Sequence, residues 1–169
     1  ISAGVDAGMT APGTTSPFTG ALATSTLNVT TLTNALGGGN VLVDASAGAA
    51  LGAGNITVST AITWVAATTI ELRAKNDVLV SAAMTDNTAG AAIKLTAGHD
   101  VTVNGALSAN GAPAAITLSA GHDVLVNAAL SANGADSVVE LRADNLGTGT
   151  GTVTFSGAGS VSGPTPTTN

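Results

Sequence analysis

The sequence predicts an all-β fold, a right-handed parallel β-helix (β-solenoid) whose coils have 23 residues and three short strands each. Three observations lead to this prediction. A long segment repeats almost unchanged at an offset of 23 residues, apolar residues within it alternate with polar ones, and Gly, Asn and Asp separate the alternating runs. Repetition at this period, with strand-like alternation between turns, is typical of stacked β-coils.

The repeat is clearest where TAGHDVTVNGALSANGA at 96–112 returns as SAGHDVLVNAALSANGA at 119–135. Aligned at this offset, the chain forms columns of similar aliphatic side chains, which predict core ladders in coils stacked about 4.8 Å apart. These columns are Ile70, Ile93, Ile116 and Val139; Leu72, Leu95, Leu118 and Leu141; Ala74, Ala97, Ala120 and Ala143; Val78, Val101 and Val124; Val80, Val103 and Val126; and Met84, Leu107 and Leu130. A further column of Asn87, Asn110 and Asn133 predicts a side-chain ladder in a turn.

The flanking segments follow the same pattern with looser spacing. Upstream, one further coil is expected from Leu27 to Leu36, before a lengthened turn at 44–54. Downstream, the glycine-rich run 147–151 interrupts the register. Further strands are expected at 40–43, 55–58, 61–64, 153–155 and 160–162. This count gives six or seven coils and a rod about 30 Å long.

The ends of the chain differ from its middle in composition. Residues 1–23 are rich in Gly, Thr and Pro and predict a tail, either a linker or a strand added to a neighbouring subunit, whereas 24–162 form the solenoid and 163–169 a linker. No apolar stripe of period 3.6 is evident, so no helix is expected and neither end should carry a cap helix. Uncapped ends predict stacking on copies of the same chain, or on flanking repeats of a larger parent chain.

The charge balance excludes several classes of partner. Lys and Arg total 4 against 10 Asp and Glu, for a net charge of −6. Nucleic-acid binding requires a basic face, so no nucleic-acid partner is expected. No apolar run is long enough to cross a bilayer, so membrane insertion is not expected either. The absence of cysteine excludes disulfides, and stability must come from repeated backbone pairing.

Several segments resemble the shaft repeats of filamentous-haemagglutinin-like exoproteins, which are exported by two-partner secretion. These segments are GNITV (54–58), ITW (62–64), TIELRA (69–74), NDVLV (76–80), the two AGHDV copies, and LRADNL (141–146). The resemblance spans about residues 24–162, although the secretion domain of that family is not evident in the sequence. It implies an exported, extended protein at the surface of a Gram-negative bacterium or outside the cell, used in adhesion, biofilm or matrix formation.

A column of polar turn residues is the strongest candidate site. His99 and His122 are one coil apart, and each precedes an aspartate. With Asp77 and the aspartates Asp100 and Asp123, they would line one edge of the solenoid as candidate ligands of a divalent cation. The favoured alternative is a polar ladder in which the aspartates accept hydrogen bonds from local amides and no metal or other cofactor is bound.

Two apolar features stand outside the core columns. Leu79 and Leu125 should point outward, because the valines on either side of each point inward, and they would form an apolar column available for lateral contact. Trp64, the only tryptophan, is expected to be partly buried and to stack between coils rather than to hold a sugar.

Together these features predict a structural function and no catalytic one: a stiff extracellular rod that stacks or polymerises into a surface filament or matrix fibre. One alternative is a shaft segment excised from a large secreted adhesin that binds cells or glycans. A more remote alternative is a polysaccharide-cleaving β-helix enzyme, which would need paired acids with basic or aromatic substrate contacts that are scarce here. A lectin-like tip would need an aromatic-lined pocket, and the sequence contains none.

Overall fold

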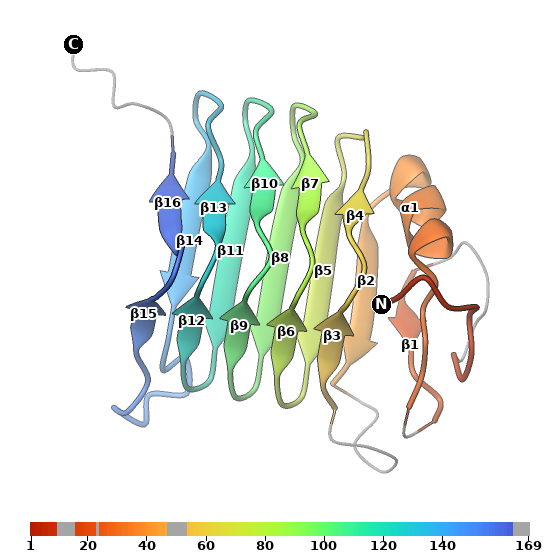
Figure 1. The fold of residues 1–169 in the computed structure, drawn as a ribbon, viewed down its shortest axis with the longest axis horizontal. Coiled ribbons are helices and arrows are strands. Elements are labelled where there is room, and N and C mark those ends of the chain that lie inside the picture. Colours follow the sequence, from red (N-terminus) through yellow and green to blue (C-terminus); the bar gives the residue numbers. More distant parts are fainter. Residues whose placement is uncertain (10–15, 23, 47–53, 164–169) are drawn as a thin grey trace.

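The computed structural model describes residues 1–9, 16–22, 24–46 and 54–163 and confirms the β-solenoid (Figure 1). Within these residues, sixteen strands form three parallel sheets. In Figure 1 the chain climbs the near side and descends the far side while it moves from right to left, which makes the coil right-handed. There are about five coils of roughly 23 residues, with three strands in each.

Each sheet takes one strand from every coil. The first sheet, on the far side in Figure 1, contains β1 (Phe18–Thr19), β2 (Val41–Ala45), β5 (Thr69–Ala74), β8 (Ala92–Ala97), β11 (Ala115–Ala120) and β14 (Val138–Arg142). The second contains β3 (Ile56–Val58), β6 (Val78–Val80), β9 (Val101–Val103), β12 (Val124–Val126) and β15 (Val153–Phe155). The third contains β4 (Ile62–Thr63), β7 (Met84–Asp86), β10 (Leu107–Ala109), β13 (Ala129–Ser131) and β16 (Ser160–Ser162).

The predicted aliphatic columns form the core. Ile116 pairs with Ile93 on one side and Val139 on the other, and Leu118 pairs with Leu95 and Leu141 in the same way. Burial along β11 alternates strictly, so every second side chain points inward, as a strand requires. Burial of each such leucine or isoleucine contributes about 1.5–3 kcal/mol relative to exposure, and the regular columns repeat this gain from coil to coil.

Asparagine ladders join the turns between coils, as predicted. The Asn110 Nδ2 donates to Asn87 Oδ1 at 3.1 Å, and Asn133 Nδ2 donates to Asn110 Oδ1 at 3.2 Å. A second pair, Asn104 and Asn127, is joined in the same way at 2.8 Å. Since side-chain amides both donate and accept, one residue type can continue such a ladder through successive coils.

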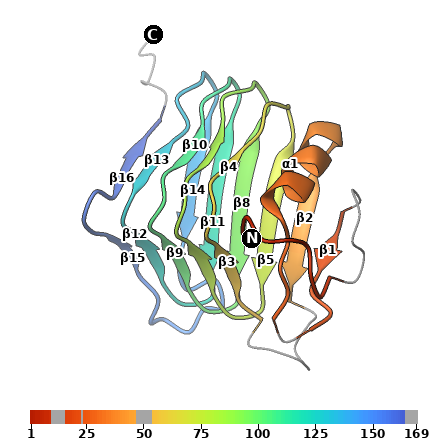
Figure 2. The same ribbon diagram turned by 45° about the vertical axis from the view of Figure 1, so that its right-hand side comes forward.

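Residues expected to form a first coil instead form α1 (Val29–Gly38), so the predictions of a coil from Leu27 to Leu36 and of no helix are wrong. Asn28 ends the extended backbone and caps the helix, because its side chain accepts a hydrogen bond from the amide of Thr30 at 2.7 Å. Leu32 and Leu36 lie one turn apart and are fully buried. The helix contacts β2 and β4, and therefore caps the N-terminal end of the solenoid (Figure 2). The loss of this coil also reduces the predicted six or seven coils to about five.

The N-terminal segment also packs on this end of the solenoid. Phe18 in β1 pairs with Val43 of β2 and is almost completely buried. Ser2 forms a parallel bridge with Asn28, and Ala7 forms an antiparallel bridge with Thr26. The described part of 1–23 therefore covers the solenoid of its own chain, whereas a tail or linker was expected. Of the linker expected at 163–169, residues 164–169 lie outside the described ranges.

Candidate functional site

The predicted histidine and aspartate column lies where the first sheet turns into the second. The turns between β5 and β6, β8 and β9, and β11 and β12 stack directly on one another. A Cβ atom on Gly98 would lie 2.0 Å from the carbonyl oxygen of Lys75, and one on Gly121 would lie 2.1 Å from that of Gly98. The turns pack closely enough to require glycine before each histidine, and this fixes where the histidines lie.

Backbone amides hold the three aspartates in place. Asp77 Oδ1 accepts from the amide of Asp100 at 3.1 Å, and Asp100 Oδ1 accepts from the amide of Asp123 at 3.0 Å. Asp123 Oδ1 accepts from the amide of Thr152 at 2.7 Å. Each carboxylate therefore connects its own coil to the next, and one of its oxygens has a fixed position.

The two histidines lie against these carboxylates. His99 Nδ1 is 3.1 Å from both Asp77 Oδ1 and Asp100 Oδ2, and His122 Nδ1 is 3.3 Å from Asp100 Oδ1 and 3.1 Å from Asp123 Oδ2. The rings stack with their centroids 5.2 Å apart and their planes 3° from parallel. The structure thus brings together all five residues predicted from the sequence, which we call the His–Asp ladder.

The last coil adds an acidic group that the sequence did not suggest. Asp144 adopts a positive φ of 54° and accepts hydrogen bonds from the amides of Thr148 and Gly149, both at 2.6 Å. The hydroxyl of Thr148, which also donates to this carboxylate, lowers the pKa of Asp144 most, followed by the amides of Gly149 and Thr148 and by the nearby His122. The pKa of Asp123 is lowered in the same sense, mainly because the amide and hydroxyl of Thr152 donate to its carboxylate.

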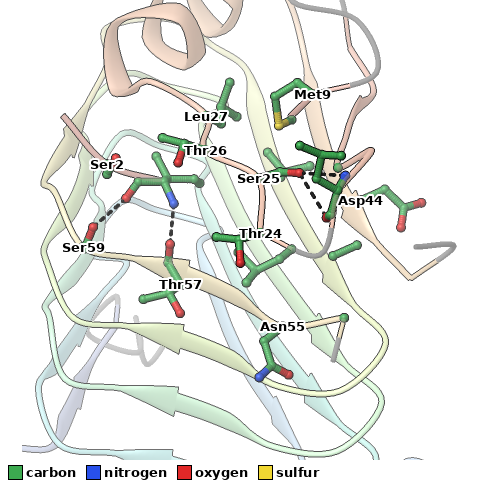
Figure 3. Close-up of a pocket in the computed structure, with 17 residues that line it drawn as sticks. Ser2, Met9, Thr24, Ser25, Thr26, Leu27, Asp44, Asn55, Thr57 and Ser59 are labelled. Carbon is green, nitrogen blue, oxygen red and sulfur yellow. Dashed lines mark hydrogen bonds between the residues drawn. The ribbon is translucent and has the colours of Figure 1, made fainter. Parts of the chain in front are cut away.

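A cavity of about 400 Å³ opens at the N-terminal end, between the N-terminal segment and the turns beside β2 and β3 (Figure 3). The Ile1 nitrogen donates to Thr57 O there, and Ser59 donates to Ile1 O. Met9, Thr24 and Gly54 on its rim are sequence neighbours of residues outside the described ranges, so we assign it no ligand. Sequence reasoning missed this cavity because it treated the N-terminal segment as a tail.

The remaining sequence candidates have simpler roles. Leu79 and Leu125 point outward and are half-buried, but Thr102 of β9 lies between them in register. The predicted apolar column is therefore interrupted by a hydroxyl group. Trp64 lies in the core and is more deeply buried than the partial burial expected, so its ring is not available as a sugar platform.

Up to residue 163, no further strand covers the C-terminal coil of the solenoid. The strands β14, β15 and β16 each pair on one side only within the described residues. Their apolar side chains, which would lie inside a continued solenoid, are partly exposed: Val153 by 39%, Phe155 by 45% and Val161 by 45%. At the other end, α1 and the N-terminal segment cover β2, β3 and β4.

Within the described residues, no helix has the length and apolar character needed to cross a membrane. No protein-family model, curated protein or solved structure matches this chain, so fold and site geometry carry the functional argument.

Proposed function

We propose that this chain is a structural, non-catalytic rod that acts outside a Gram-negative cell and joins other β-coils through its C-terminal end. The observation that carries this proposal is the difference between the two ends: one is covered by its own chain, and the other exposes three strand edges and the ends of the aliphatic columns. An unpaired strand edge is a template for pairing with another strand.

The middle of the molecule supports a mechanical role. Three parallel ladders run from coil to coil around a dry aliphatic core, so each inner coil is held by hydrogen bonds on both sides. Such a repeat transmits load along its axis and leaves little backbone open to proteases. The extracellular location is supported by the resemblance of its repeats to haemagglutinin-like shafts.

The capped end changes how copies would join. Head-to-tail stacking, the simplest form of a filament, requires a free edge at both ends. Here Ile1 pairs with the residues around β3, and α1 lies against β4. We therefore propose that copies join by their C-terminal ends. The alternative remains a shaft segment whose open end is covered by flanking repeats of a larger secreted adhesin.

Electron microscopy and light scattering over a dilution series test this proposal, with Val161→Lys as the open-end variant and Asn34→Lys, on the exposed face of α1, as its matched control. The wild-type protein is expected to associate into particles two rods long. Val161→Lys should remain as single rods, because burying the lysine charge at the joint is unfavourable, whereas Asn34→Lys should associate like the wild type. Single rods at every concentration would refute joining between copies and leave the shaft alternative. Long filaments that persist in Val161→Lys would refute the assignment of the open end.

A further inference from the structure

We propose that the His–Asp ladder binds one divalent transition-metal ion, with His99, Asp100 and His122 as ligands. Each of these residues offers a ligand atom, and the three atoms lie within 4.8 Å of one another. Asp100 is the centre of the group, because its two oxygens face the Nδ1 atoms of both histidines at 3.1 and 3.3 Å. Because the two rings are stacked with their planes 3° from parallel, a metal ion bound to both Nδ1 atoms would require the imidazoles to rotate toward each other.

The charge of the ladder favours a cation. Three carboxylates occupy successive coils about 4.8 Å apart, a spacing at which like charges repel. Within the described part of the chain, the ion pairs of Arg73, Lys94 and Arg142 are all with other carboxylates. Lys75, which precedes Asn76 and Asp77 in the first of these turns, forms no ion pair with the ladder carboxylates within the same residues. A divalent metal ion bound among the carboxylates would offset their repulsion.

The supporting residues hold the ligands in place before a metal binds. The Oδ1 atoms of Asp77 and Asp100 accept amide hydrogen bonds from the next coil, and this fixes the plane of each carboxylate. The strands that follow the two histidines begin with the fully buried Val101 and Val124, so the turns are anchored to the core. Fixed outer partners of this kind orient metal ligands and strengthen binding.

The ladder also has limits that favour a single ion. The residue in register with the histidines is Asn76 in the preceding coil and Gly151 in the following coil. A side chain at position 151 would clash with the backbone, because its Cβ atom would lie 2.1 Å from the carbonyl oxygen of His122. The nitrogen ligands are therefore confined to two adjacent coils. The rings of His99 and His122 are exposed by 54% and 38%, so an ion can reach them from solvent.

The ligand types select the class of metal. Two imidazole nitrogens and a carboxylate oxygen suit Zn²⁺, Ni²⁺ or Cu²⁺, whereas Mg²⁺ and Ca²⁺ prefer oxygen ligands alone. Binding through Nδ1 would replace the contacts of these atoms with the carboxylates and would place the ring proton on Nε2.

The test is calorimetric titration of the untagged protein with ZnCl₂, with His122→Asn as the site variant. Asn already occupies the equivalent turn position at Asn76, so this variant keeps a side chain that the fold accepts, and far-UV circular dichroism checks its folding. The matched control is Asn76→Ala, which alters the neighbouring turn without removing a proposed ligand.

We expect one Zn²⁺ per chain in the wild type and in Asn76→Ala, and at least tenfold weaker binding in His122→Asn. Nitrogen chemical shifts of the two imidazoles identify the ligand atom, and Nδ1 of both rings should shift on titration. The proposal is refuted if the wild type shows no saturable binding, or if His122→Asn binds Zn²⁺ as tightly as the wild type. Either result would mean that the ladder is only a hydrogen-bonded turn stack.

Discussion

The aliphatic ladder makes a quantitative prediction at Leu118. This side chain is fully buried in β11, with Leu95 and Leu141 as its register partners in the adjacent coils. In Leu118→Ala the three lost carbons leave a void, and the backbone ladders on both sides hold the coils apart so that the void cannot close. Leucine-to-alanine changes in cores cost about 2–5 kcal/mol, and we expect the upper half of that range because the walls are rigid.

Urea unfolding followed by far-UV circular dichroism measures this cost. The matched control is Thr117→Ala, which changes the neighbouring outward residue of the same strand and should cost less than about 1 kcal/mol. Leu141→Ala should cost less than Leu118→Ala, because Leu141 has a neighbour on one side only and is partly exposed. Equal costs for Leu118→Ala and Thr117→Ala would refute the rigid-ladder reasoning.

Three further predictions concern the turns and the cap. Gly98→Ala should destabilise the fold by about 1–3 kcal/mol, because the added Cβ would clash with the carbonyl oxygen of Lys75. Gly38→Ala should stabilise the fold by about 0.5–1 kcal/mol, because alanine has the higher helix propensity and its Cβ would meet no other atom. Thermal melts of the two variants compare these effects. The pKa values of Asp123 and Asp144 are lowered in the folded state. The stability that these groups contribute is therefore present above the ordinary carboxyl pKa and is lost as the pH falls through the lowered values. In Asp144→Asn the melting temperature should consequently decline less steeply as the pH is lowered. Asn28→Ala removes the helix cap and the 2.6 Å bond from Asn28 Nδ2 to Gly4 O, and should cost about 0.5–2 kcal/mol in urea unfolding.

The repeated coils could be predicted because one spacing determines several features at once. A 23-residue offset that aligns Ile93 with Ile116 also aligns the flanking turns, so core columns, the Asn110 ladder and the His99–His122 stack all follow from the same alignment. Parallel in-register pairing then places identical side chains next to each other. The His–Asp ladder was accessible to sequence reasoning for this reason.

The cap could not be predicted from its local sequence. The apolar face of α1 is only Leu32, Ala35 and Leu36, and its β-branched threonines and final glycines have low helix propensity. Packing of that face on the end of the solenoid outweighs the propensity. The pairing of the N-terminal segment was missed because Ser2 meets Asn28 through contacts that leave no periodic pattern.

The sequence indicated that the run 147–151 interrupts the register, but it did not indicate the role of Asp144 in the loop of the last coil. The extra residues between Asp123 and Val153 shift the register, so Asp123 pairs with Thr152 where a continued repeat would supply another aspartate. The positive φ of Asp144 is part of this departure, and a repeat alignment gives no signal for it. The change ends the His–Asp ladder at the coil of His122 and Asp123. The same insertion that interrupts the sequence repeat therefore also limits the proposed metal site.

The difference between the two ends predicts an asymmetric pattern of amide hydrogen exchange. In dilute protein, β8, β9 and β10 should exchange slowest because each is paired on both sides, whereas β14, β15 and β16 should exchange fastest because one edge of each is open. The N-terminal coil should be protected more than the C-terminal one, since α1 and Ile1 cover β4 and β3. Raising the protein concentration should slow exchange in β14–β16 selectively if copies join there. Equal exchange at the two ends in dilute protein would refute the capping role of α1, and with it the reason for expecting copies to join only at the C-terminal end.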